Sequence, residues 1–199
     1  MEKFSVLYSK GNGNFYERRI ETSVNEESFI KEVINEIIQL IEKLSQSGNY
    51  DIVKLLYAIR HKLSQLVYLY CNLAKDKDPE QIVYKISKKP RINQMAYVNI
   101  GRGFPKELMD GHWCYIVKDM GVKAIVIPST SIKNESKTIN PFYEMDIIVK
   151  DKDEIETSRL QLSDMRTIDY QRIDFRKEFY TVLTPRKQIM KFVKKNLFD

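Results

Sequence analysis

The sequence predicts an α+β protein in which two helices precede a small β-barrel and a last helix. Two segments between residues 23 and 74 repeat apolar residues at helical spacing. Short runs rich in valine, isoleucine and tyrosine then follow between residues 95 and 162, separated by turn residues. We therefore expect an N-terminal α-helical hairpin domain at residues 1–80 and a β-barrel domain at residues 90–199.

Composition is that of a globular chain. Of its 199 residues, 43% are apolar and 30% are charged, which excludes a disordered chain. The formal net charge of +6 is compatible with a nucleic-acid partner, although many proteins without such a partner share it. No signal peptide and no membrane-spanning run is visible, so we expect a cytoplasmic protein that does not enter a membrane.

Cysteine usage argues against a disulfide scaffold. The two cysteines, Cys71 and Cys114, fall in a predicted helix and a predicted strand, and no CxxC pair exists. We expect free thiols, no metal site and no cofactor.

The first 21 residues alternate apolar and polar positions on either side of Gly11-Asn12-Gly13. This pattern fits a short hairpin or a loosely ordered arm. The glycines lack the third glycine and the preceding apolar strand of a phosphate-binding loop, so we interpret them as a turn.

Two helices are predicted next. The apolar positions of the first are Phe29, Val33, Ile34, Ile37, Ile38, Ile41 and Leu44. Those of the second are Val53, Leu56, Ile59, Leu63, Leu66, Val67, Tyr70 and Leu73. The short connection at 47–51 predicts an antiparallel hairpin that cannot hide both apolar stripes by itself. The hairpin is an accessory module, a regulator that covers the functional site, or plain structural support.

A charged stretch at 75–79 and a basic cluster at 85–91 mark the expected domain boundary. Beyond it we predict strands at 95–100, 113–118, 122–128, 143–149 and 158–162. The tail, 176–198, is predicted to be helical and broken at Pro185, with a lysine-rich amphipathic helix at 186–197.

Candidate chemistry centres on His112, which follows the loop 101–105 and precedes Trp113. Histidine is the usual proton-transfer group near neutral pH, and the alternative role is a structural hydrogen bond. Thr130 and Ser131 end a buried strand, where hydroxyls hold a phosphate or simply form a turn. His61 has no acidic or cysteine partner at metal-ligand spacing, so we interpret it as structural.

Four arginines lie close together in the sequence, and arginine suits bidentate phosphate contacts. They are Arg159, Arg166, Arg172 and Arg176. Several aromatic residues offer surfaces for stacking unpaired bases, or else belong to the core. They are Trp113, Tyr115, Tyr143 and Tyr170.

The order of four stretches, 97–101, 111–117, 126–131 and 162–172, resembles the MazF/PemK family of toxin endoribonucleases. The last stretch, with Arg166-Thr167-Ile168-Asp169, is the most specific match. The resemblance covers about residues 93–199. It implies an SH3-like, MazF/PemK-type barrel with a C-terminal helix, a homodimer, and a cognate antitoxin protein as a partner in a toxin–antitoxin system.

The resemblance also implies metal-independent cleavage of single-stranded RNA through a 2′,3′-cyclic phosphate. The residues expected to carry the chemistry are His112, Thr130 and Ser131. Those expected to bind RNA or phosphate are Arg102, Trp113, Arg166 and Arg172. Trp113 stands where the family has its catalytic arginine, and Cys114 where it has a proline. The alternatives are therefore a non-catalytic barrel that binds nucleic acid or protein, and a regulator that acts only through partner proteins.

Overall fold

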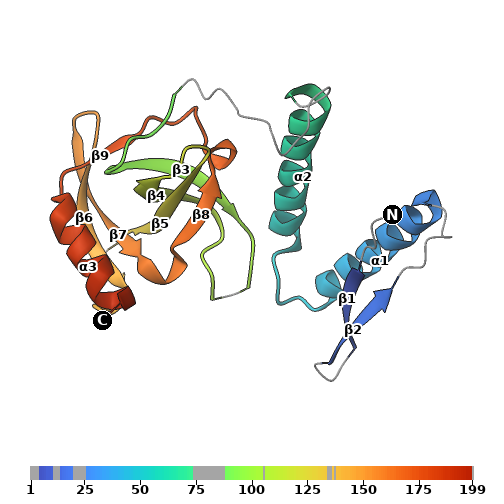
Figure 1. Cartoon of the computed structure of the whole chain (residues 1–199). Coiled ribbons are helices and arrows are strands. Elements are labelled where there is room, and N and C mark those ends of the chain that lie inside the picture. The colour runs from blue at the N-terminus through green and yellow to red at the C-terminus, as the bar shows by residue number, and fades with distance from the viewer. Residues whose placement is uncertain are drawn as a thin grey trace. The chain divides into compact units, whose positions relative to one another are not determined.

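The computed structural model describes residues 5–10, 14–19, 26–73, 88–104, 106–133, 136 and 138–198, with backbone alone for the first two ranges. The chain divides into two compact units, residues 1–56 and 57–199 (Figure 1). The division falls inside a helix rather than at the expected boundary between 80 and 90, most of which lies outside the described residues.

The first unit opens with an antiparallel hairpin of β1 (Ser5–Lys10) and β2 (Asn14–Arg19), in which Tyr8 pairs with Tyr16. The alternating residues at Ser5–Lys10 and Asn14–Arg19 therefore form a hairpin rather than an arm. The glycine-containing turn predicted at residues 11–13 lies outside the described residues.

Helix α1 (Glu26–Gln46) follows the hairpin. Glu26 and Glu27 occupy its first turn, where their charge complements the helix dipole. None of its residues is buried.

Among the helices that the structure describes, none is long and apolar enough to cross a membrane.

Helix α2 (Ile52–Tyr68) begins after Asp51, whose Oδ1 accepts a hydrogen bond from the backbone N–H of Lys54 at 3.0 Å. This contact caps the helix start. The helix ends in a π-helical turn, Leu69–Leu73, and none of the residues of α2 is buried. Both predicted helices are confirmed, whereas their antiparallel packing stays a prediction.

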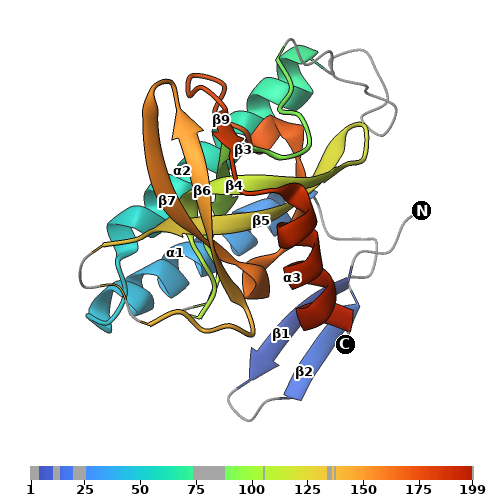
Figure 2. The same ribbon diagram turned by 90° about the vertical axis from the view of Figure 1, so that its left-hand side faces the viewer.

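The strands of the second unit are β3 (Gln94–Gly101), β4 (Asp110–Asp119), β5 (Lys123–Ser131), β6 (Glu144–Asp151), β7 (Glu154–Gln161), β8 (Arg166–Asp169) and β9 (Tyr180–Val182). In the described part of the chain, six antiparallel strands close into a barrel in the order β4-β3-β9-β6-β7-β5, because β5 pairs back to β4 (Figure 2). Strand β8 pairs with the first half of β5, beside the stretch that pairs with β7. The predicted α+β class with a small barrel is confirmed.

Strands β3, β4 and β5 are buried on both faces because their alternate residues enter two different clusters. One cluster fills the barrel and reaches the C-terminal helix; its buried members are Met95, Tyr115, Val117, Ile127, Ile147, Val149, Leu160, Leu162, Val182, Ile189 and Val193. The other lies under β8 and the turn after it; its buried members are Ala96, Val98, Ile100, Cys114, Ile116, Ala124, Val126, Ile168, Tyr170 and Ile173.

Helix α3 (Arg186–Phe198) closes one side of the first cluster with Ile189 and Val193. Arg186 fixes the start of the helix to β4, since its guanidinium donates to Tyr115 Oη at 3.2 Å and to the carbonyl oxygen of Val117 at 3.0 Å. The amphipathic helix predicted at 186–197 is thus confirmed.

The helix predicted across residues 176–184 is wrong. Tyr180–Val182 forms strand β9, which pairs with both β3 and β6 and completes the barrel. Thr184 then accepts a hydrogen bond through Oγ1 from the backbone N–H of Ile148 at 2.7 Å. Pairing on both sides outweighs the local helical periodicity, which cannot report on partners distant in sequence.

Candidate nucleic-acid interface

His112 lies on β4 and is half-buried. Its Nδ1 is 3.0 Å from the carbonyl oxygen of Ser129, and its Nε2 is 3.0 Å from that of Met109. A neutral imidazole donates from one nitrogen only, whereas the imidazolium donates from both. Both nitrogens face carbonyl oxygens, so proton exchange with a substrate requires one of these contacts to break. This geometry favours the structural role over proton transfer.

The hydroxyl groups at the end of β5 hold strands together. Ser129 is buried and donates through Oγ to the carbonyl oxygen of Trp113 at 3.0 Å, while Ser158 on β7 donates to Ser129 Oγ at 2.8 Å. Thr130 is half-buried, and its Oγ1 accepts from Gln161 Nε2 at 3.4 Å. Ser131, the last residue of β5, is exposed. His112 and Thr130 thus come from paired strands, but their side chains make structural contacts.

Trp113 is packed between two tyrosines. Its ring stacks on Tyr180, with centroids 3.7 Å apart, and meets Tyr97 edge-on at 5.6 Å. Burial, the first cause, and the acidic residues Asp151, Glu156 and Glu154 raise the pKa of Tyr180 to about 12. Trp113 therefore contributes to packing at one end of the barrel.

Two of the predicted phosphate-binding arginines face acidic groups of the barrel. Arg102 Nε lies 3.6 Å from Asp110 Oδ1, and the Arg102 side chain is 10% exposed. Arg166 on β8 donates through Nε to the carbonyl oxygen of Asp164 at 3.2 Å and through Nη2 to its Oδ1 at 3.4 Å. The positive charge of Arg166 also lowers the pKa of the Cys114 thiol, against the larger effect of burial.

Cys114 is fully buried, and this burial raises the pKa of its thiol to about 12. Cys71 is exposed. Because the thiolate is the reactive form, Cys114 is chemically inert in the folded barrel. Of the two thiols, only Cys71 meets solvent.

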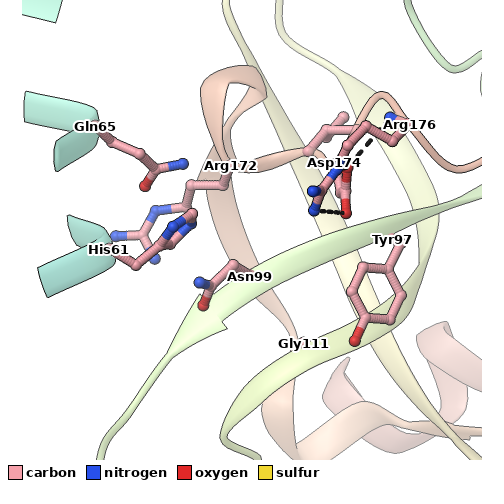
Figure 3. Close-up of a pocket in the computed structure, with 9 residues that line it drawn as sticks. His61, Gln65, Tyr97, Asn99, Gly111, Arg172, Asp174 and Arg176 are labelled. Atoms are coloured by element: carbon pink, nitrogen blue, oxygen red, sulfur yellow. Dashed lines mark hydrogen bonds and ion pairs between the residues drawn. The ribbon is translucent and has the colours of Figure 1, made fainter. Parts of the chain in front are cut away.

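Arg172 lines a cavity of about 450 Å³ in the second unit (Figure 3). On the barrel side, the cavity is bordered by Tyr97 and Asn99 of β3 and Gly111 of β4. Arg172 is half-buried and donates through Nη1 to the carbonyl oxygen of Ile100 at 3.4 Å. This contact holds the guanidinium against β3, and Figure 3 shows Asn99 near it with the Tyr97 ring further along the strand.

Gly111 gives Tyr97 its position in this wall. A Cβ at residue 111 would lie 2.3 Å from Tyr97 Oη and 2.6 Å from its Cζ. The tyrosine ring therefore occupies the space that any other residue at 111 would fill. Lys177 lies over the same ring, with its Nζ 4.5 Å from the ring centroid.

The other wall belongs to α2. His61 and Gln65 line the cavity, and Figure 3 shows both on the same side as Arg172. Gln65 Nε2 is 3.5 Å from the carbonyl oxygen of Gln171. The structure therefore brings an imidazole from the helical segment to an arginine of the barrel.

The charge around the cavity is set by the segment after β8. Arg176 and Asp174 form a paired contact, with Nε–Oδ1 and Nη2–Oδ2 distances of 2.7 Å each. This contact with Arg176 is the main cause that lowers the pKa of Asp174. Arg176 is thus neutralised locally, which makes Arg172 the main positive group among the residues that line the cavity.

Of the seven predicted site residues, Arg172 alone lines this cavity. Sequence reasoning missed Tyr97, Asn99 and Gln65 and interpreted His61 as structural. One signal was available: Tyr97, Asn99 and Gly101 alternate along β3, which places the first two on one face of the strand. The approach of α2 had no comparable signal.

No protein-family model matches the chain, and no curated protein matches its sequence. The MazF/PemK resemblance therefore stays a prediction that depends on the four sequence stretches alone.

Proposed function

We propose that the second unit binds single-stranded RNA, with the cavity between α2 and β3 as the binding site. The observation that carries the proposal is the wall formed by Arg172, Tyr97 and Asn99. A guanidinium suits phosphate, an aromatic ring stacks on an unpaired base, and an amide donates to and accepts from base edges. An excess of six positive charges over the chain supports attraction to a polyanion.

Arg172 and Asn99 are each held by a contact that a ligand does not need to break. Arg172 Nη1 is fixed by the Ile100 carbonyl oxygen, and a guanidinium carries further N–H donors. Asn99 uses Oδ1 to accept from the backbone N–H of Gly101 at 2.9 Å. Such pre-organisation lowers the entropic cost of binding.

The test is fluorescence anisotropy of a labelled, unstructured single-stranded RNA titrated with the full chain in EDTA at low and moderate salt. We expect Arg172→Gln to weaken binding about tenfold, the loss typical of one charge-assisted hydrogen bond. The matched control is Arg91→Gln, which removes the same charge from an exposed position that does not line the cavity. Equal losses in both variants, or no binding by the parent chain, would contradict the proposal.

We also propose that the barrel is of the SH3-like, MazF/PemK type, that a cognate antitoxin binds it, and that it acts in the cytoplasm. The order of the four family-like stretches supports this proposal. Thr130 and Ser131 at the end of β5 match the family's Thr-Ser strand end. A solved structure that superimposes on the family only over isolated strands, with different connections, would contradict the assignment.

A second candidate function is metal-independent endoribonuclease activity, and the position of His61 favours it. An imidazole and a guanidinium share one cavity there. In the proposed step, His61 takes the proton of the ribose 2′-OH, and the 2′-oxygen bonds to phosphorus. The bond to the 5′-oxygen breaks, that oxygen takes a proton from water, and Arg172 stabilises the phosphorane charge.

This candidate predicts discrete cuts with 5′-OH ends in a long single-stranded RNA with EDTA present, and no cut where the scissile nucleotide is 2′-deoxy. Loss of cleavage in His61→Ala, with cleavage retained in His112→Ala, would assign the base to α2. The reverse outcome would return the role to His112. RNA that stays intact while it binds would leave the barrel as a binding module.

A further inference from the structure

Helix α2 presents its polar side to the cavity and its apolar side to solvent. His61 and Gln65 face the barrel wall, whereas Leu63, between them in sequence, is 56% exposed. A surface helix normally buries its apolar stripe in its own domain. This reversal leaves a row of large, mostly exposed apolar side chains on α2.

The row has the spacing of a helical bundle. In α2 it alternates steps of four and three residues through Ile52, Leu56, Ile59, Leu63 and Leu66. In α1 the same alternation runs through Ile30, Ile34, Ile37, Ile41 and Leu44. An average step of 3.5 residues keeps a row facing one neighbouring helix, as in bundles and coiled coils.

Most of these side chains are exposed, whereas Ile41, Leu44, Ile52 and Leu66 are half-buried. Ile34 and Ile37 are 50% and 47% exposed, and Ile38 is 47% exposed beside them. Viewed down the axis of α1, with about 100° of rotation per residue, Leu40 and Ile38 lie at the two edges of the apolar face. This face covers close to half of the helix circumference. One neighbouring helix covers less than that, so α1 needs at least two neighbours.

The two helices carry opposite charges. Helix α1 has five glutamates and two lysines, a net charge of −3. Helix α2 has Lys54, Arg60 and Lys62 and no acidic residue, a net charge of +3 with His61 neutral. Two copies of one chain therefore bring two acidic and two basic helices, so every apolar row meets a partner of opposite charge.

We propose that α1 and α2 of two copies of this chain associate into a four-helix bundle, which makes the protein a dimer through its helices. A two-fold axis gives a self-complementary interface of this kind, because each surface contributes to both sides. The same arrangement leaves the polar side of α2, with His61 and Gln65, next to the barrel. It places one candidate RNA site on each copy.

The experiment is sedimentation equilibrium of the full chain over a range of concentrations and salt. The test variants are Ile37→Asp in α1 and Leu63→Asp in α2. Their matched controls put the same charge outside the rows at exposed residues, Gln39→Asp on the opposite side of α1 and Ser64→Asp about 100° from Leu63 on α2. Trp113, the only tryptophan, lies in the barrel, so its fluorescence reports whether that unit stays folded in every variant.

We expect the parent chain to sediment as a dimer at micromolar concentration, with a weaker dimer at high salt. We expect the two row variants to raise the dissociation constant about 100-fold, and the controls to change it by less than about threefold. A parent chain that stays monomeric at about 100 μM would overturn the proposal, since a bundle interface of standard size associates well below that. So would a dimer that row and control variants weaken equally, because another surface would then hold it.

Discussion

Strands β3–β5 and helices α1–α2 are similarly rich in large aliphatic residues, yet they end in opposite environments. Ile127 of β5 has no exposed surface, whereas Ile38 of α1 is 47% exposed. The strands receive cover on both faces from elements that follow them in the sequence. The helices receive none that buries a residue. An apolar pattern therefore identifies the face that seeks cover, while the rest of the fold decides whether that cover is present in the same chain.

The largest expected contrast is between two isoleucines. Ile127→Ala leaves a cavity in the barrel cluster and should lower the free energy of unfolding by about 2–5 kcal/mol. Ile38→Ala, measured at a concentration too low for association, should lower it by less than about 0.5 kcal/mol, as is usual at an exposed site. Urea denaturation followed by Trp113 fluorescence checks both. Equal losses would show that α1 is covered within its own chain.

The two histidines give the next contrast. His112→Ala removes the ring contacts to the carbonyl oxygens of Met109 and Ser129, and should destabilise the barrel by about 1–3 kcal/mol. RNA affinity of this variant should stay unchanged at a temperature where it is folded. His61→Ala should do the opposite, since His61 is exposed and lines the cavity. Anisotropy titration and thermal denaturation of both variants separate the two roles.

The two thiols extend the contrast to alkaline pH. Burial raises the pKa of Cys114 from 9.0 to about 12, so the folded chain keeps a proton that the unfolded chain loses. Below pH 9 the thiol is protonated in both states, so the free energy of unfolding keeps its full value there. Between pH 9 and 12 the unfolded chain loses the proton first, and the free energy of unfolding falls. At pH 10 the loss should be roughly 1 kcal/mol. Urea denaturation of Cys114→Ala should show a smaller loss of the free energy of unfolding between pH 9 and 10 than the parent chain shows.

Of the two thiols, a thiol reagent at pH 8 should modify Cys71 alone until the chain unfolds.

The smallest expected contrast concerns two glycines. Gly111→Ala should displace the Tyr97 ring from the cavity wall and weaken RNA binding several-fold, because the new Cβ overlaps that ring. Gly48 has φ +65° and open space around it. Gly48→Ala should therefore cost about 1 kcal/mol of backbone strain without an effect on RNA affinity. Loss of affinity in Gly48→Ala alone would contradict the assigned cavity.

The sequence predicts the elements of the barrel better than their partners. Five strands were predictable because β-branched residues alternate along them, and α3 because its apolar residues recur at helical spacing. Strands β8 and β9 were not, since each has only three or four residues and is stabilised by pairing with distant strands. Local pattern carries no information about such pairing.

The candidate site was predictable only where one strand contains its residues. His112 was a reasonable candidate by residue type, but the carbonyl oxygens that hold its ring come from a loop and from β5. The cavity joins α2 to β3 and to the turn that contains Arg172. Neither the contacts of the His112 ring nor the α2 wall of the cavity can be inferred without the fold.

The attachment of α3 to the barrel also constrains how the chain is made. Arg186, Ile189 and Val193 complete a core whose first member is Met95. During synthesis β3 to β7 emerge before this last wall exists, so the apolar interior of the nascent barrel stays open until α3 has left the ribosome. The second unit therefore folds as a whole after its translation.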